Sequence, residues 1–146
     1  MSSRALAVVE DSDEDFAALT RALDGGPQDV VRFRDGDEAL YRLCDPATDW
    51  PAVLLLDLNL PGRSGIEILT AVRAAPALQR LPVVVLSGSS RREDVLGAYE
   101  HGANAYIVKP LVFAELRRAL LSVWSFWNMA IVPGPPAARA SGYGLL

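Results

Sequence analysis

The sequence predicts an α/β fold built on a parallel, doubly wound sheet, and two observations lead to this prediction. Short runs of consecutive apolar residues recur along the chain, which is typical of strands that are covered on both faces. Between these runs lie segments with apolar residues at helical spacing, such as Phe16, Leu19 and Leu23. Strands that alternate with helices form βα units, and their right-handed crossovers place helices on both sides of one sheet. The five apolar runs are residues 5–9, 30–33, 53–56, 83–86 and 105–108.

Four of the expected helices begin with a polar residue three positions before a carboxylate, which is the spacing of an N-terminal cap. Pro61-Gly62 predicts a turn after the third strand, and Gly102 predicts the end of the fourth helix. A last helix is expected from about residue 112 to residue 128. The four cap pairs are Ser12 with Asp15, Asp35 with Glu38, Ser64 with Glu67, and Ser90 with Glu93.

This (βα)5 order favours a flavodoxin-like sheet with the strand order 2-1-3-4-5. The 146 residues are enough for one domain with its own core. We expect that domain to span residues 1–128, and residues 129–146, which are rich in Pro, Gly and Ala, to form a C-terminal extension.

Composition excludes several classes of function. With 18 acidic and 14 basic side chains, the net charge is 14 − 18 = −4, and the scattered arginines form no basic stripe for nucleic acid. No 18-residue apolar stretch predicts a membrane span, so we expect a cytoplasmic protein. The single cysteine, Cys44, excludes an internal disulfide and is interpreted as a small buried hydrophobe. The single histidine, His101, is interpreted as a helix-end residue, so any metal would be held by oxygen ligands.

Polar residues follow all five expected strands, and the second, at the predicted edge of the sheet, is followed by Arg34. Glu10 and Asp11 follow the first, Asp57 the third, Ser87 the fourth and Lys109 the fifth. Ligands of such sheets bind beyond the carboxyl ends of the strands, so we expect these side chains to converge. Carboxylates that meet at one place need a cation between them, and oxygen ligands favour Mg2+. The alternative is that residues 10–15 are only a solvated acidic helix start, which leaves Asp57 unexplained.

Asp57 emerges from a buried strand, where an ionised carboxylate needs a partner. Beside Mg2+ it is suited to attack phosphorus and form an aspartyl phosphate, although a strand-ending aspartate also often caps a turn. Lys109 is the only lysine among the 14 basic residues, and its compact ammonium is suited to a phosphoryl oxygen. Pro110 predicts a fixed turn after it, with the Lys109–Pro110 bond a candidate for the cis form.

Two further residues have open interpretations. The Ser87 hydroxyl is suited to a hydrogen bond with a phosphoryl oxygen. Tyr106 either rotates when Ser87 is drawn inward or is a plain core aromatic.

The motifs together resemble the receiver domain of two-component response regulators. The resemblance implies that Asp57 accepts a phosphoryl group from a sensor histidine kinase and that Glu10, Asp11 and the Asn59 backbone carbonyl hold Mg2+ with it. It also implies that Lys109, Ser87 and Gly88 contact the phosphoryl group and that Ser87 and Tyr106 form the conformational switch. Most receivers have Thr where this chain has Ser87. The matching segments are residues 8–11, 55–62, 85–88 and 102–110.

A receiver is a signalling protein whose only chemistry is its own phosphorylation and dephosphorylation, and its output is a change of shape. The roughly twenty residues after the receiver are too few for a helix-turn-helix output domain. We therefore expect a stand-alone receiver.

The last helix carries Trp124, Phe126 and Trp127 on more than one face. Its sequence is similar to single-domain regulators that serve bacterial and cyanobacterial phytochromes and often form homodimers. That resemblance implies a bacteriophytochrome kinase and a second copy of the chain as partners. An aromatic cap over the domain's own core is the alternative.

Two other protein classes share parts of this pattern. A phosphatase of the haloacid dehalogenase type also uses an aspartate nucleophile with Mg2+, but its second acid would stand at Asn59 and its nucleophile would end the first strand. A flavodoxin-like FMN-binding protein needs a loop rich in Ser and Thr after the first strand, where this chain has acids that repel phosphate.

Overall fold

The computed structural model describes residues 5–135 and contains one parallel five-stranded sheet in the order β2-β1-β3-β4-β5. This architecture confirms the predicted fold class and strand order. The elements are β1 (Leu6–Val9), α1 (Asp13–Ala22), β2 (Val30–Phe33), α2 (Gly36–Leu43), β3 (Val53–Leu56), α3 (Gly65–Ala74), the 3-10 turn η1 (Pro76–Leu78), β4 (Val83–Ser87), α4 (Arg92–Glu100), β5 (Ala105–Val108) and α5 (Phe113–Met129).

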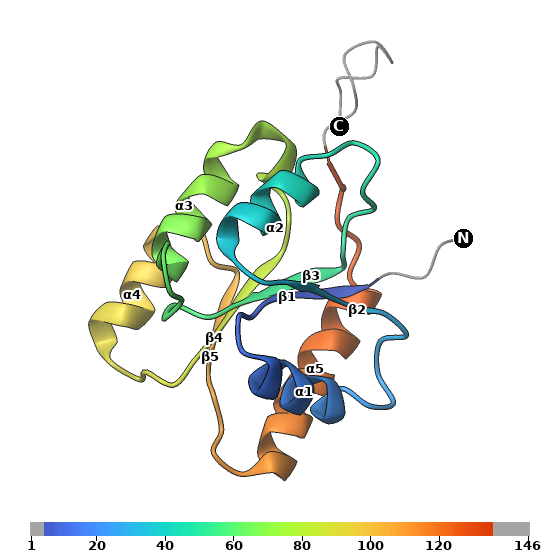
Figure 1. Ribbon diagram of the computed structural model, residues 1–146, viewed down its shortest axis with the longest axis vertical. Helices are drawn as coiled ribbons and strands as arrows, with labels where there is room; N and C mark the ends of the chain where they lie inside the picture. The colour runs from blue at the N-terminus through green and yellow to red at the C-terminus, as the bar shows by residue number, and fades with distance from the viewer. Residues whose placement is uncertain (1–4, 136–146) are drawn as a thin grey trace.

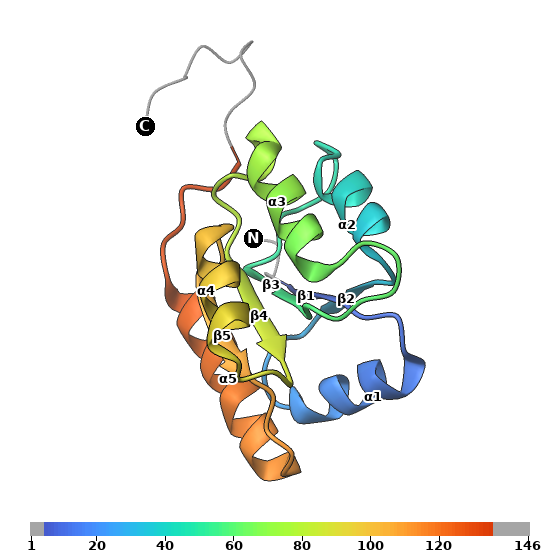
Figure 2. The ribbon, with the colours of Figure 1, turned by 90° about the vertical axis from the view of Figure 1, so that its left-hand side faces the viewer.

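Helices cover both faces of the sheet. Helices α1 and α5 lie on one face, and α2, α3 and α4 lie on the other (Figure 1). Figure 2 shows the same division after a quarter turn. Side chains alternate between the two faces along each strand: Leu54 and Leu56 enter the core under α2 and α3, whereas Val53 and Leu55 enter the core with α1 and α5. Both faces are therefore buried, which explains why the strands are continuously apolar.

Three of the four predicted helix caps are confirmed. The side chains of Ser12, Asp35 and Ser64 each accept a hydrogen bond from the backbone N–H three residues later. The prediction for Ser90 is wrong, because α4 is capped by Arg91 without a side-chain bond. Ser89 is the residue engaged at this helix start, since its hydroxyl donates to Asp94 and accepts from the Arg91 N–H.

Two single residues test the sequence interpretation further. The prediction that Cys44 is buried is wrong, because it is exposed at the C-cap of α2. The buried side of this short helix carries Ala39 and Leu43, and Cys44 lies one step around the helix from Leu43. His101 caps the end of α4, with its Nδ1 2.7 Å from the Gly97 carbonyl, which confirms its interpretation as a helix-end residue.

Gly65 lets α3 begin directly against the end of β3. A Cβ at this position would overlap the Asp57 carbonyl oxygen and lie 2.5 Å from the Cα of Leu58. Because both neighbours are backbone, no side chain can rotate away. We expect Gly65→Ala to lower the free energy of unfolding by about 1–3 kcal/mol in urea titrations.

Gly97 is the matched control, because a Cβ there would meet no atom within 4 Å. Gly97→Ala in the middle of α4 is expected to raise the free energy of unfolding by about 0.5–1 kcal/mol. Equal effects of the two substitutions would contradict the packing argument.

None of the helices within residues 5–135 combines the length and apolar character needed to cross a bilayer.

Candidate functional site

Three of the predicted site residues meet at the carboxyl ends of neighbouring strands. Glu10 follows β1 and Asp57 follows β3, and the register pairs Val9 with Leu56 directly before them. Glu10, Asp57 and Lys109 line one small cavity of about 10 Å³ with apolar residues of β1, β3 and β4. That volume corresponds to roughly one water molecule. The structure therefore brings two carboxylates and the only lysine together, as the strand-end argument predicts.

The Glu10 side chain is buried, with 7% of its surface exposed. Burial raises the pKa of its carboxyl above the ordinary value, and the charges of Asp15 and Asp11 act in the same direction. The Ser12 backbone N–H, which donates to Oε2 over 3.1 Å, and the Lys109 ammonium lower that pKa. An added positive charge nearby stabilises the ionised form of a carboxyl group that is desolvated in this way.

Asp11 and Asn59 are exposed, and Asp57 is half-buried. Oδ1 of Asp57 accepts a 3.0 Å hydrogen bond from the Asn59 N–H, which holds the loop after β3 against the carboxylate. This bond is local, and it fixes the side chain at the point where the strand ends.

The donor set fits Mg2+. No three His, Cys, Asp or Glu side chains within the described range 5–135 form a ready-made metal cluster. Mg2+ does not require one, because it keeps several waters and takes one or two carboxylates together with a phosphate oxygen. Glu10 and Asp57 on one cavity, with Asp11 directly after Glu10 in the sequence, supply hard oxygen ligands of this type.

The hydroxyl groups predicted to form a switch are linked through one loop. Ser87 is fully buried, and its Oγ accepts a 3.2 Å bond from the Ser89 N–H. The half-buried Tyr106 donates its hydroxyl to the Ser89 carbonyl over 2.8 Å. Gly88, between the two serines, is exposed. Ser89 thus connects Ser87 to Tyr106, a role that no motif in the sequence indicates.

The prediction of a cis bond between Lys109 and Pro110 is wrong in this structure, because no peptide bond among the described residues is cis. The Lys109 N–H donates to the Ser87 carbonyl over 2.7 Å, which extends the pairing of β5 with β4. The trans form of an X–Pro bond is already favoured by about 0.5–1 kcal/mol, and this extended exit from the strand accommodates it.

The three aromatic residues near the end of α5 have different surroundings. Trp124 and Trp127 are half-buried against the core under α1 and α5. Phe126 is 56% exposed, and its ring packs edge-on against that of Trp127, with the two ring centres 4.9 Å apart. The two tryptophans thus cover the domain's own core, as the interpretation of an aromatic cap predicts, whereas Phe126 adds exposed apolar surface and the dimer stays a prediction.

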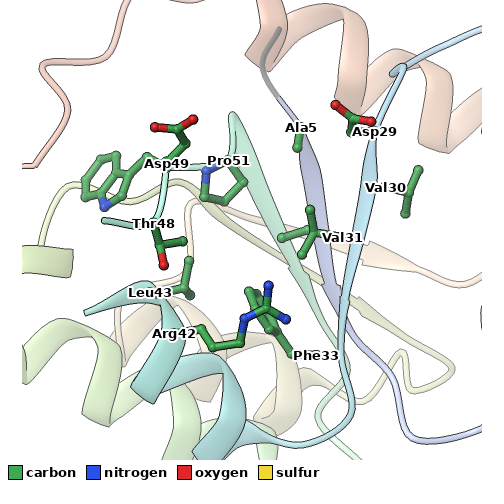
Figure 3. A pocket seen from close by; sticks show the side chains of 12 residues that line it. Ala5, Asp29, Val30, Val31, Phe33, Arg42, Leu43, Thr48, Asp49 and Pro51 are labelled. Carbon is green, nitrogen blue, oxygen red and sulfur yellow. The ribbon is translucent and has the colours of Figure 1, made fainter. Parts of the chain in front are cut away.

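A second cavity, of about 380 Å³, runs along the edge strand β2 from the amino end of the sheet to Phe33. Figure 3 shows its lining, which includes Ala5, Asp29 and Pro51, just before β1, β2 and β3. Arg42 projects over the ring of Phe33 at 5.1 Å in this cavity. Glu10, Asp57 and Lys109 do not line this cavity, so it is separate from their cluster.

Comparison with known proteins identifies the class to which this fold and site belong. The family model of the response regulator receiver domain matches residues 6–121. The chain belongs to the response regulator receiver family, a family of signalling proteins. The matched range contains Glu10, Asp57 and Lys109, and the result favours a receiver over the phosphatase and flavodoxin alternatives.

Several relatives cover nearly the whole chain. The probable methanogenesis regulatory protein FilR2 of Methanothrix harundinacea is 35% identical over 136 residues, which covers 88% of this chain and 86% of that protein. Response regulator Rcp1 of Synechocystis is 33% identical, with 85% of this chain and 88% of Rcp1 covered. The Mn2+-bound form of Rcp1 superposes with a TM-score of 0.77 at 31% identity, covering 90% of this chain and 99% of that chain. The phosphorylated cyanobacterial phytochrome response regulator RcpA gives a TM-score of 0.81 at 33% identity, covering 91% of this chain and 100% of that chain.

Proposed function

We propose that this chain is a stand-alone response regulator in which Asp57 accepts a phosphoryl group from a sensor histidine kinase in a Mg2+-dependent reaction. The observation that carries the proposal is the convergence of Glu10, Asp57 and Lys109 on one cavity at the carboxyl end of the sheet. The proposal assigns residues 1–128 to the receiver and residues 129–146 to an extension.

In the proposed reaction, a carboxylate oxygen of Asp57 forms a bond to phosphorus while the bond from phosphorus to the donor breaks. The electron pair of the broken bond leaves with the donor, which takes up a proton. Lys109 places its ammonium on the same cavity and stabilises the negative charge of the transferred group. Glu10, Asp11, Asp57 and the Asn59 carbonyl would hold Mg2+, which supplies further positive charge beside the phosphoryl oxygens. The Mn2+-bound form of the relative Rcp1 supports a divalent ion in this role.

The same proposal gives Ser87 and Tyr106 the role of a switch. A phosphoryl group on Asp57 adds acceptor oxygens that the Ser87 hydroxyl is suited to meet. Ser87 is coupled to Tyr106 because both bond to Ser89, one to its N–H and the other to its carbonyl. Movement of this loop is therefore expected to change the orientation of Tyr106, and Gly88 gives the loop room beside the phosphoryl group.

We propose a phytochrome-type kinase as the partner, because the chain is similar over 91% of its length to RcpA, a cyanobacterial phytochrome response regulator. FilR2, a probable methanogenesis regulatory protein, is similar to this chain to about the same degree. The assignment of a phytochrome-type kinase therefore also rests on the resemblance of the last helix, α5, to the regulators that serve phytochromes. The proposal places the chain in the cytoplasm with its ATP-dependent kinase and includes no direct contact with nucleic acid. It also limits the chemistry of the chain to its own phosphorylation and dephosphorylation.

The test of the proposed function is labelling by a small phosphodonor such as acetyl phosphate. With Mg2+ present, the intact mass of the full chain is expected to rise by the mass of one phosphoryl group. Treatment with hydroxylamine is then expected to remove this group, because hydroxylamine cleaves acyl phosphates. Chelation of the divalent ion with EDTA is expected to prevent the gain. An unchanged mass in the presence of both donor and Mg2+ would falsify the proposal.

We further propose that the chain forms a homodimer through the end of α5. Phe126, Met129 and Ile131 are 56%, 76% and 99% exposed and lie within six residues of one another in the sequence, at and just after the end of α5. Phe126→Glu is expected to weaken dimerisation by at least about tenfold, because a charge would have to be buried in the contact. Sedimentation equilibrium over a range of concentrations measures the effect.

Tyr41→Glu is the control for this substitution, because Tyr41 is 81% exposed but lies on α2, across the sheet from α5. It is expected to leave the dimer unchanged. A monomer at all concentrations, with and without a phosphoryl mimic, would remove the dimer from the proposal.

A further inference from the structure

We propose that Arg32 is a positioning residue that fixes the segment between β1 and α1 in the conformation that binds the divalent ion. This inference rests on the proposed function, and no motif in the sequence indicates a role for Arg32. Arg32 lies on the edge strand β2, opposite Val8 of β1 in the register. Its side chain therefore reaches the end of β1 from the neighbouring strand.

Arg32 holds this segment on both sides of Asp11. Its Nε donates to the Glu10 carbonyl over 2.8 Å, and its Nη1 donates to the Asp13 carboxylate over 2.7 Å. The guanidinium also lies 5.0 Å from the centre of the Phe16 ring on α1. One rigid, planar group thus connects the main chain before Asp11 to the helix that follows it.

The geometry suits a positioning role better than a simple surface ion pair. The Arg32 side chain is only 13% exposed, and its Nη2 is buried without a hydrogen-bond partner among the described residues. A buried donor without an acceptor costs free energy of folding, so this arrangement of the guanidinium is not the most stable one. What the arrangement does achieve is a fixed path for residues 10–13, which contain two of the proposed metal ligands.

Arg34 provides a natural comparison within the same cluster. It also bonds Asp13, over 3.2 Å, but its side chain is 62% exposed. Its backbone N–H bonds Glu38 of α2, and its guanidinium has no recorded bond to Glu10. Arg32 and Arg34 therefore share the ion pair with Asp13 and differ in the bond to the Glu10 carbonyl.

The test is a calorimetric titration of the full, unphosphorylated chain with Mg2+. Arg32→Lys keeps the positive charge but loses the planar fork that reaches two acceptors at once. We expect it to weaken Mg2+ binding by about tenfold, the lower end of the effect of residues that orient metal ligands. Arg34→Gln is expected to change the affinity by less than about twofold, because it removes only an exposed ion pair.

Labelling kinetics give a second readout. The Arg32→Lys variant is expected to need about tenfold more Mg2+ for half-maximal labelling and to reach the wild-type rate at saturating Mg2+. A residue that only stabilises the fold would lower the unfolding temperature and leave the Mg2+ dependence unchanged.

The outcomes separate this inference from the proposed function. Wild type that neither binds Mg2+ nor is labelled refutes the proposed function itself. Wild-type binding that Arg32→Lys leaves unchanged, or that Arg34→Gln weakens equally, refutes only the role of Arg32. If Arg32→Lys does not fold, Arg32→Gln is titrated instead, with weaker binding again expected. Failure of both variants to fold shows that Arg32 is needed for folding and overturns the inference.

Discussion

Replacing Asp57 with asparagine is expected to lower the rate of phosphoryl labelling by more than about 1,000-fold, as removal of a nucleophile generally does. The neutral amide has no anionic oxygen with which to attack phosphorus. In the wild type, the Asn59 N–H donates to Oδ1 of Asp57 over 3.0 Å. The amide carbonyl oxygen of asparagine can accept the same hydrogen bond. The loop after β3 is therefore retained, and the free energy of unfolding is expected to change by less than about 1 kcal/mol. Intact mass after incubation with acetyl phosphate and Mg2+ measures the labelling.

Asp49→Asn is the matched control for this experiment. Asp49 is exposed and lies on the cavity along β2, which Asp57 and Lys109 do not line. Its replacement is expected to leave both the extent and the rate of labelling unchanged. Equal labelling of Asp57→Asn and wild type would show that another residue accepts the phosphoryl group.

Replacing Arg73 with methionine is expected to lower the free energy of unfolding by about 3 kcal/mol, because several charge-assisted hydrogen bonds to backbone carbonyls, most of them partly buried, are lost together. Arg73 extends from α3 and is half-buried. Burial lowers the pKa of its guanidinium. Its five recorded acceptors are neutral oxygens of the segments around η1 and β5: the carbonyls of Leu78, Gln79, Leu81 and Gly102 and the Asn104 side chain, at 2.8–3.2 Å.

Urea titration followed by circular dichroism checks this prediction. Arg73→Lys is expected to lose most of the same stability, because an ammonium cannot reach acceptors spread over so many segments. Arg91→Met is the control, since the Arg91 side chain forms only an exposed ion pair with Glu93, and a change within about 0.5 kcal/mol is expected. Similar losses for Arg73→Met and Arg91→Met would contradict the bridging role.

The sequence predicts the fold and most of the cavity because the determining signals are either local or repeated. Consecutive apolar residues mark strands buried on both faces, and a parallel sheet brings the residues after those strands together. This rule predicts the meeting of Glu10, Asp57 and Lys109, which the structure contains. The caps at Ser12 and Ser64 are predictable because they span only three residues.

The features that could not be predicted depend on partners far apart in the chain. Arg32 bonds Glu10 across 22 positions, and Arg73 bonds Gly102 across 29. Neither arginine stands in a motif that indicates its partner, because arginine is common on exposed helix and strand surfaces. The role of Ser89 could not be predicted for a related reason, since its bond to Tyr106 forms only when β4 and β5 are side by side.

Helix α5 begins four residues after Lys109 and continues without a break to Met129, for 17 residues. At 1.5 Å of rise per residue it is a rod about 25 Å long. If its first turn is tilted by about 5°, simple leverage on a rod of this length carries its far end sideways by about 2 Å. Under the proposed function, a tilt of this kind on phosphorylation would carry the change at Asp57 to the surface around Phe126, where a neighbouring molecule would sense it.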